Sequence, residues 1–237
     1  MLIFDAHCHL DAITNNNEYL SRALVSSVNL NDISKLLQLR YNNKFYKVGF
    51  GIHPWFIDSK VRPEDLINEL LAQCIKNSPD FIGEIGLDKL KPSFTYQVEL
   101  FKLQLEIAVK FKLPVVVHCV KAYNEVLQLI KQYKVTGVIH GFNANYKIAQ
   151  QFIEAGFLIG VGSLVIKNSQ IRRDIAKIPL TNIVFETDAP YMPLFNKVRS
   201  QLSDIFLYAQ TAASQYNLNL IDVIHQVNNN MEQLFRN

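Results

Sequence analysis

The chain has 237 residues and a mass of 27.2 kDa; 49% of the residues are apolar and 19% are charged. This composition supplies a sizeable core and excludes disordered, collagen-like and low-complexity proteins. The formal net charge is only +3, which by itself does not indicate a nucleic-acid partner.

We expect neither a membrane protein nor a secreted one. No unbroken apolar run approaches the ~18 residues needed to cross a bilayer. The N-terminus lacks the basic region and cleavage site of a secretory signal. The three cysteines, Cys8, Cys74 and Cys119, fit neither a disulfide framework nor a CxxC zinc site. The default expectation is a reduced, cytoplasmic compartment.

Eight short runs rich in apolar and β-branched residues predict strands, and segments of helical period lie between them. The predicted strands are Leu2–His7, Arg22–Val28, Lys47–Ile52, Phe81–Gly86, Pro114–His118, Val135–His140, Phe157–Val161 and Asn182–Thr187. Helices are predicted around Ile33–Leu37 and Leu66–Leu70, between Ser93 and Pro114, over Ile148–Ala155 and near Ile224–Leu234.

This alternation predicts parallel strands joined by right-handed crossovers. Eight such units in 237 residues match a (β/α)₈ TIM barrel of the α/β class, with residues 1–237 as a single domain. An open, doubly wound sheet is the structural alternative. No linker or internal repeat is evident.

Five of the six histidines lie at or just beyond the ends of predicted strands, and only His225 lies in a helical pattern. The five are His7, His9, His53, His118 and His140. In a parallel barrel the carboxyl ends of the strands converge on one face, where active sites form. Five imidazoles directed at one mouth predict a shared site rather than core packing.

The segment Asp5-Ala-His-Cys-His9 places three polar side chains on one side of the first strand, because strand side chains alternate. His7 and His9 can then offer nitrogen ligands to one metal ion, and Asp5 can orient a ligand from behind. A pair of hydrogen-bonded strand histidines is the alternative. Alternation turns Cys8 to the other side, and Cys119 likewise, so we expect both to pack as small buried residues.

Two carboxylates follow apolar strands in company with these histidines. Glu84 lies between Gly83 and Gly86, where backbone and cations can approach closely enough for the carboxylate to bridge two ions. Asp188 follows the last strand and can ligate a metal and accept the proton of an attacking water. His53 lies at the same rim and is expected to contact substrate.

Four histidines with two carboxylates form a mixed nitrogen and oxygen ligand set suited to Zn²⁺, Mn²⁺, Co²⁺ or Mg²⁺. The candidate metal ligands are His7, His9, Glu84, His118, His140 and Asp188. Two ions sharing Glu84 would lie about 4 Å apart and generate hydroxide near neutral pH. We therefore predict an enzyme that carries out hydrolysis with two divalent metal ions and no organic cofactor.

Together these motifs resemble the TatD family of metal-dependent hydrolases and deoxyribonucleases. The matching segments are Asp5–His9, Gly51–Pro54, Gly83–Asp88, His118, His140, Glu186–Tyr191 and Asn230–Phe235, in order along the chain. The resemblance implies an amidohydrolase-type TIM barrel. It also implies a nuclease that trims DNA from one end, 3′ to 5′.

By this resemblance His7, His9, Glu84 and Asp188 hold one ion, and Glu84, His118 and His140 hold the other. Asp188 is then the base, His53 faces the scissile phosphate, and Glu186 supports a ligand from behind.

The chain departs from the family pattern at the rim, where substrate contacts are expected. An arginine is usual two residues after the strand-five histidine, but Val120 and then Lys121 stand here, and Asn143 occupies a position that is usually serine. We expect Lys121 and Asn143 to contact substrate.

Residues 110–200 hold twelve Lys and Arg against five Asp and Glu, a local net charge of +7 that leaves −4 elsewhere. This basic half attracts polyanions such as DNA, although a solvated lysine surface is the alternative. Two other functions stay open: hydrolysis of a small amide, ester or phosphoester, and a metal-stabilised binding module without turnover. No coiled coil or interface stripe is evident, so a monomer is favoured.

Overall fold

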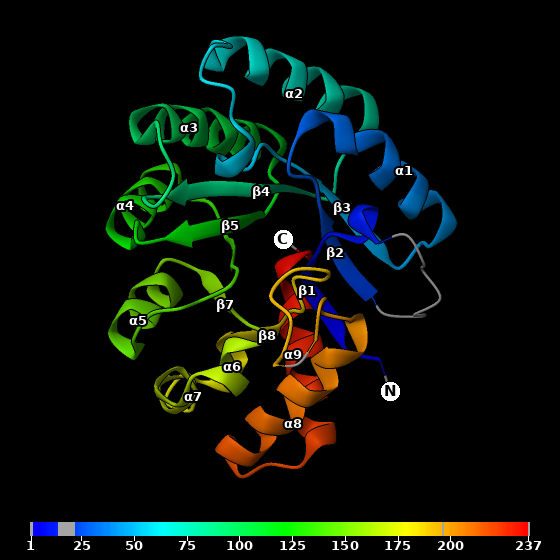
Figure 1. Ribbon diagram of the computed structural model, residues 1–237, viewed down its shortest axis with the longest axis vertical. Helices are drawn as coiled ribbons and strands as arrows, with labels where there is room; N and C mark the ends of the chain where they lie inside the picture. The colour runs from blue at the N-terminus through cyan, green and yellow to red at the C-terminus, as the bar shows by residue number, and fades with distance from the viewer. Residues whose placement is uncertain (1, 14–21, 196, 237) are drawn as a thin grey trace.

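A computed structural model describes residues 2–13, 22–195 and 197–236 of the protein. Eight strands run parallel, in chain order around a nearly closed barrel, and helices surround it (Figure 1). The strands are β1 (Phe4–Cys8), β2 (Arg22–Ser26), β3 (Tyr46–Phe50), β4 (Phe81–Asp88), β5 (Val115–Val120), β6 (Gly137–Ile139), β7 (Phe157–Val161) and β8 (Ile183–Phe185). The predicted α/β barrel is therefore confirmed.

Hydrogen bonds beyond the last strand bring the two ends of the sheet together. The Asp188 N–H donates to His7 O at 2.9 Å, and the His9 N–H donates to Ala189 O at 2.7 Å. Because these bonds involve residues at the carboxyl ends of β1 and β8, they also fix two candidate ligand segments against each other.

The helices cover the outside of the barrel. They are α1 (Ile33–Asn42), α2 (Pro63–Asn77), α3 (Phe94–Phe111), α4 (Tyr123–Tyr133), α5 (Tyr146–Glu154), α6 (Leu164–Lys167), α7 (Ser169–Ile175), α8 (Ile205–Tyr216) and α9 (Leu220–Leu234). Short 3₁₀ turns are η1 (Leu10–Ala12), η2 (Leu30–Asp32), η3 (Pro54–Phe56), η4 (Leu180–Asn182) and η5 (Leu202–Asp204). In the part of the chain that the structure describes, no helix is both long and apolar enough to cross a membrane.

The five predicted helices correspond to α1, α2, α3, α5 and α9, whereas α4, α6, α7 and α8 were not predicted. The helix α4 could have been predicted from the sequence, because Val126, Leu129 and Ile130 recur at helical spacing on its buried face. By contrast, α8 contains no charged residue and many small ones, so its two faces are hard to distinguish in the sequence.

A small apolar cluster fills the barrel beneath the histidines. Val116 and Val138 lie two residues before His118 and His140, so strand alternation places each pair on the same face. The cluster consists of Phe4, Ala6, Leu24, Phe81, Val116, Val138, Val184 and Met231. It forms a floor that separates the histidines from the far end of the barrel. A larger cluster, which includes Cys8 and Cys119, packs the strands against the helices, as expected for both cysteines.

The C-terminal helix α9 ties the barrel floor together. The side chain of Asn230 donates to the carbonyls of Leu180 (2.8 Å) and Ile183 (2.7 Å), and Met231 enters the barrel cluster. The Phe4 N–H donates to Asn228 Oδ1 at 2.8 Å. The helix therefore links the start of β1 to the start of β8.

Gly86 is a position where the fold requires glycine. Its φ is +145°, and a Cβ built there would lie 2.0 Å from the carbonyl oxygen of His118 on β5. We expect Gly86→Ala to lower the free energy of unfolding by about 2 kcal/mol or more, because strained backbone and a backbone clash combine. Urea unfolding monitored by circular dichroism measures this.

Gly156→Ala is the matched control. Gly156 also has a positive φ of +88°, but its added Cβ would meet only a Thr136 methyl, at 3.3 Å. We expect a cost of about 1 kcal/mol there. Equal losses in the two variants would contradict a special requirement for Gly86.

Candidate metal centre

The structure brings together all six side chains that the sequence singled out as metal ligands. His7 lies in β1, Glu84 in β4 and His118 in β5. The other three, His9, His140 and Asp188, lie just beyond β1, β6 and β8. Five of them lie near or just beyond the carboxyl ends of their strands, and Glu84 lies midway along the longer β4. The carboxylate of Asp188, 16% exposed, is the most accessible of the six side chains.

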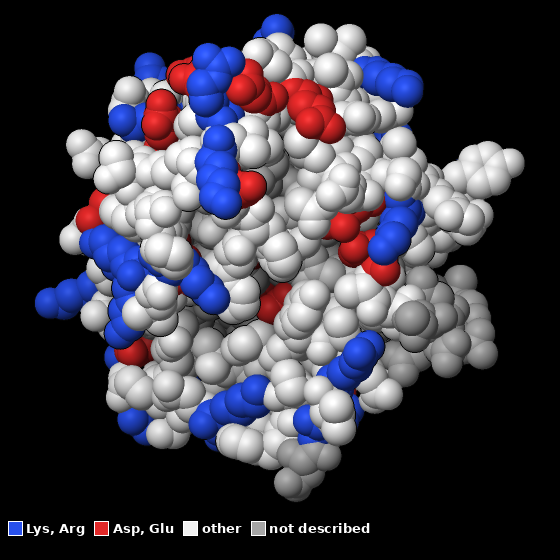
Figure 2. Space-filling model, turned by 45° about the horizontal axis from the view of Figure 1, so that its top comes forward, with Lys and Arg blue, Asp and Glu red and all other residues white. Residues whose placement is uncertain are grey.

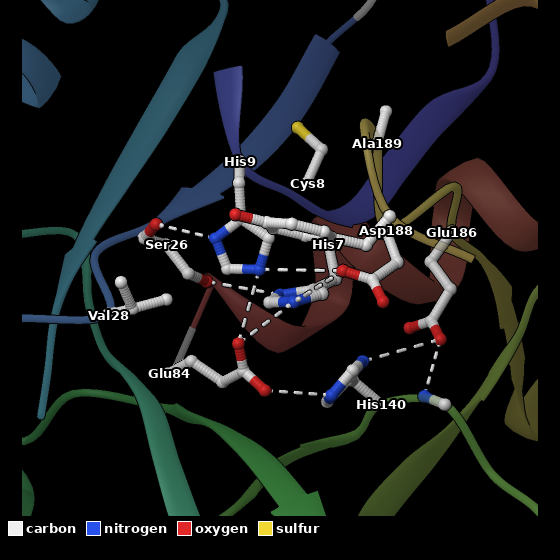
Figure 3. Close-up of polar contacts among 12 residues, drawn as sticks. His7, Cys8, His9, Ser26, Val28, Glu84, His140, Glu186, Asp188 and Ala189 are labelled. Atoms are coloured by element: carbon white, nitrogen blue, oxygen red, sulfur yellow. Dashed lines mark hydrogen bonds and ion pairs between the residues drawn. The ribbon is translucent and has the colours of Figure 1, made fainter. Parts of the chain in front are cut away.

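Glu84 lies at the centre of this cluster, and its two oxygens face different partners (Figure 3). Oε2 lies 3.2 Å from the Nε2 atoms of both His7 and His9. Oε1 lies 2.8 Å from His140 Nε2 and 3.1 Å from His118 Nδ1. One carboxylate is thus shared by two pairs of imidazoles.

Asp188 completes the first of these pairs. Its Oδ1 lies 3.6 Å from His7 Nε2 and 3.4 Å from His9 Nε2. Groups of three potential ligand atoms, all within 4.8 Å of one another, occur here three times: His7, Glu84 and His140; His7, His9 and Asp188; His53, Glu84 and His118. The described residues therefore offer more than one position for a cation.

Neighbours behind the rings leave the inward nitrogens free to ligate. His9 Nδ1 lies 3.2 Å from the carbonyl oxygen of Ser26, so in the neutral ring this nitrogen carries the proton and the lone pair is on Nε2. His140 Nδ1 faces Glu186 Oε1 at 3.6 Å, and His118 Nε2 faces Asp88 Oδ2 at 3.5 Å. Both rings therefore have an anion behind, and in its neutral form each ring can direct a lone pair toward Glu84.

His53 differs from the other four. Its Nδ1 accepts a hydrogen bond from the Trp55 N–H at 3.1 Å, and its Nε2 lies 3.2 Å from Glu84 Oε1. In the neutral ring the proton must then be on Nε2, which leaves no lone pair for a cation. This arrangement suits a hydrogen-bond donor rather than a metal ligand.

The charges of the centre are strongly coupled. Burial would raise the pKa of Glu84, but His53, His140, His7 and His118 around it hold that pKa well below its ordinary value. Burial would lower the pKa of His9, yet its contacts with Asp188 and Glu84 raise that pKa to about 10. The carboxylates thus stay ionised and require positive charge nearby, which imidazolium protons or metal ions can supply.

Asp5 supports the centre through the backbone rather than through a ligand ring. Its Oδ1 accepts the N–H groups of His7 and Thr187, and its Oδ2 accepts the Thr187 hydroxyl at 2.6 Å. Burial raises the pKa of Asp5 to about 7. Asp5 therefore holds the end of β1 against the segment that leads to Asp188.

Sequence reasoning missed three residues that bear on the site. Asp88 accepts the Trp55 indole N–H at 2.6 Å while facing His118, and Ser26 Oγ lies 3.1 Å from His7 Nδ1. Asp88 could have been found, because it lies four residues after Glu84 on the same strand. Trp55 carried no comparable signal, since only the folded chain places its indole against Asp88.

Three more of the predicted residues lie near the metal centre, and His225 lies far from it in the chain, on the C-terminal helix. Glu186 is buried behind His140, whereas Lys121 and Asn143 are exposed just after β5 and β6. Cys8 points away from the carboxylates (Figure 3). His225 is exposed on α9.

The chain is similar to proteins of one family along nearly its whole length. The family model described as TatD related DNase matches residues 4–236. A protein of Haemophilus influenzae named an uncharacterized metal-dependent hydrolase is 32% identical over 223 residues, which cover 82% of this chain and 84% of the relative. Human deoxyribonuclease TATDN3 is 27% identical, over 98% of this chain and 94% of its own.

A solved structure shares the fold. The crystal structure of YjjV, a TatD homologue from Escherichia coli, superposes with a TM-score of 0.90 at 23% sequence identity. The superposition covers 99% of this chain and 98% of that one. The two proteins therefore share the same arrangement of barrel strands and surrounding helices.

Metal binding at this centre should displace protons. The raised pKa values of His9, about 10, and of His140 mean that both imidazoles are protonated at pH 7 in the metal-free protein. We expect the affinity for Zn²⁺ or Mn²⁺ to fall as pH is lowered, by about tenfold per pH unit for each proton displaced. Calorimetric titration in buffers of different ionisation enthalpy counts these protons. An affinity that does not change between pH 6 and 8 would contradict this assignment.

Asp88 should strengthen metal binding through His118. We expect Asp88→Asn to weaken binding of the metal by about 10- to 100-fold, because the anion behind the ligand ring is lost. Metal titration monitored by calorimetry checks this. Asp58→Asn, in an exposed loop, is the matched control and should bind as the parent does. Unchanged affinity in both variants would show that Asp88 does not act on His118.

Proposed function

This chain belongs to the TatD-related DNase family of metal-dependent hydrolases, and from that premise we propose that it cleaves phosphodiester bonds in DNA as a 3′-to-5′ exonuclease with two divalent metal ions. The division of the Glu84 carboxylate between two pairs of imidazoles carries the proposal. A carboxylate that offers one oxygen to each of two nitrogen pairs is suited to bridge two cations.

His7, His9, Glu84 and Asp188 would hold one ion, and Glu84, His118 and His140 would hold the other. The mixed nitrogen and oxygen donors suit Zn²⁺, Mn²⁺, Co²⁺ or Mg²⁺. When bound, such ions act as Lewis acids that activate water at neutral pH and neutralise charge on the transferred phosphoryl group.

Asp188 would accept the proton of the attacking water. Its carboxylate is more exposed than that of Glu84, 16% against 3%, so solvent can reach it. Burial would raise the pKa of Asp188, but its hydrogen bond with His9 and the charge of His7 lower it. Asp188 is therefore ionised and able to act as the base at neutral pH.

His53 would donate a hydrogen bond to a phosphate oxygen of the substrate. The Trp55 N–H occupies its Nδ1, so its proton is carried on Nε2, toward the centre. Burial and the neighbouring His118 lower the pKa of His53, although Glu84 opposes them. The ring is then neutral at pH 7 and donates without adding a full charge.

Exposed aromatic rings around the centre favour a nucleic acid over a small ester or amide. Trp55, Phe56 and Tyr191 are each about half exposed. Their rings lie 6.0 Å, 5.9 Å and 5.4 Å from those of His118, His53 and His9, respectively. Bases of single-stranded DNA stack on such platforms at a gain of about 1–3 kcal/mol each.

Basic side chains add attraction for phosphate at this rim. Lys91 Nζ lies 4.1 Å from the centroid of the Trp55 ring, and Lys121 is exposed after β5. Figure 2 shows a face of the molecule on which Lys and Arg side chains surround a hollow with acidic side chains at its floor. A polyanion can thus approach although the centre itself holds carboxylates.

The test is degradation of end-labelled single-stranded and double-stranded DNA by metal-loaded protein, with metal analysis of the same preparation. We expect Glu84→Ala and His118→Ala each to reduce the rate at least about 100-fold, because each removes a metal ligand. A chelator should abolish the activity and added metal should restore it.

His225→Ala is the matched control, since His225 is exposed on α9, and it should leave the rate unchanged. Degradation by the Glu84 and His118 variants at the parent rate would overturn the proposed mechanism. Turnover of a small ester or amide without any DNA degradation would instead favour a small-substrate hydrolase. The absence of any turnover by metal-loaded protein would favour a binding module.

A further inference from the structure

A second hollow adjoins the metal centre on the side of Asp188. It measures about 270 Å³, including the part open to solvent, and lies between the ends of β6 and β8 and the start of α6. Ser163, Glu186 and Asp188 line it, together with the apolar side chains of Leu164 and Met192. The part that can hold a water-sized group is about 20 Å³, so the hollow has room for one small polar group of a larger substrate.

Two of the residues that line this hollow each have a buried polar atom without a partner in the described part of the chain. Ser163 Oγ and Glu186 Oε2 make no hydrogen bond with any residue that the structure describes. Ser163 is 2% exposed and Glu186 is 1% exposed. A buried polar group without a hydrogen bond is costly, so a substrate group that pairs with these atoms would recover that free energy on binding.

The carboxylate of Glu186 is fixed in place by its surroundings. Its Oε1 accepts the Gly141 N–H and faces His140 Nδ1 (Figure 3). A Cβ at Gly160 of β7 would lie 2.3 Å from its Oε2, so this glycine provides the space for the free oxygen. Glu186 therefore presents one unused acceptor beside the centre while its other oxygen supports a candidate ligand.

The chemistry of the hollow selects a neutral hydrogen-bond donor. A carboxylate oxygen only accepts, a serine hydroxyl both donates and accepts, and the Asp188 carboxylate lies alongside. A hydroxyl can donate to a carboxylate oxygen and accept from a serine hydroxyl, whereas a phosphate would be repelled by both carboxylates. Leu164 and Met192 offer apolar contact to the carbon face of a sugar.

Resting on the proposed exonuclease function, we propose that this hollow is a subsite for the free 3′-hydroxyl of the terminal nucleotide. That hydroxyl lies on the sugar next to the last phosphodiester, so it reaches a subsite beside Asp188 when that bond is at the centre. An internal nucleotide carries a charged phosphodiester in the same place. The subsite would therefore admit chain ends and exclude internal positions.

Nucleotide binding to metal-loaded protein tests this directly, without depending on turnover. The probes are thymidine 5′-monophosphate, its 3′-deoxy analogue and thymidine 3′,5′-bisphosphate, measured by calorimetry. We expect the 3′-deoxy analogue to bind at least about tenfold more weakly than the monophosphate, because the hydrogen bonds of the 3′-hydroxyl with Glu186 and Ser163 are both lost. The bisphosphate should bind more weakly still.

Ser163→Ala should reduce the difference between the first two probes to less than about threefold. Ser169→Ala, an exposed serine six residues further on, is the matched control and should keep the parent's preference. Because Ser163 Oγ has no partner among the described residues, Ser163→Ala should keep the parent's melting temperature and metal content. If Ser163→Ala then loses the preference for the monophosphate over its 3′-deoxy analogue, the loss is due to the subsite and not to misfolding.

Equal binding of the monophosphate and its 3′-deoxy analogue by the parent would overturn this subsite, as would a preference that Ser163→Ala leaves unchanged. Tighter binding of the bisphosphate would overturn it as well. DNA degradation that ignores a 3′-deoxy end would refute the subsite alone. If the parent neither binds these nucleotides nor degrades DNA, the proposed function fails and the subsite fails with it.

Discussion

A buried carboxylate that must keep its charge is the constraint on which this structure depends. Glu84 is 2% exposed, and an ionised carboxylate removed from water is costly unless opposite charge lies close by. Imidazoles lie against both of its oxygens, and a carboxylate, a carbonyl or, for His7, the Ser26 hydroxyl lies behind each of these rings. A site built in this way is stable only with cationic charge inside it, which is why it suits metal ions.

The barrel makes such a cluster possible because parallel strands bring their carboxyl ends to one face. The polar side chains stand above an apolar floor, and each comes from a strand end that backbone hydrogen bonds hold in register. Loops then add groups that the strands cannot supply. The Trp55 indole, for example, reaches from η3 to Asp88 and so links the exposed rim to the residue behind His118.

Small residues matter as much as charged ones in this arrangement. Gly86 lets β4 and β5 approach beside His118, and Gly160 leaves room for Glu186. Glu186 shows how one side chain can serve two purposes, since one oxygen faces a candidate ligand and the other lies free in a neighbouring hollow. The space for substrate and the support for metal are thus parts of the same packing.

The sequence by itself determined the eight-unit barrel and the six residues that meet at its mouth, because strand periodicity and the position of His, Glu and Asp at strand ends are local properties. It also led to the prediction that two cations share Glu84. Only the tertiary structure decided which oxygen faces which ring, that Asp88 and Ser26 lie behind two of the histidines, and that His53 has its Nδ1 occupied. Those relations join residues far apart in the chain, and their distances depend on strand register and loop packing, which no local pattern encodes.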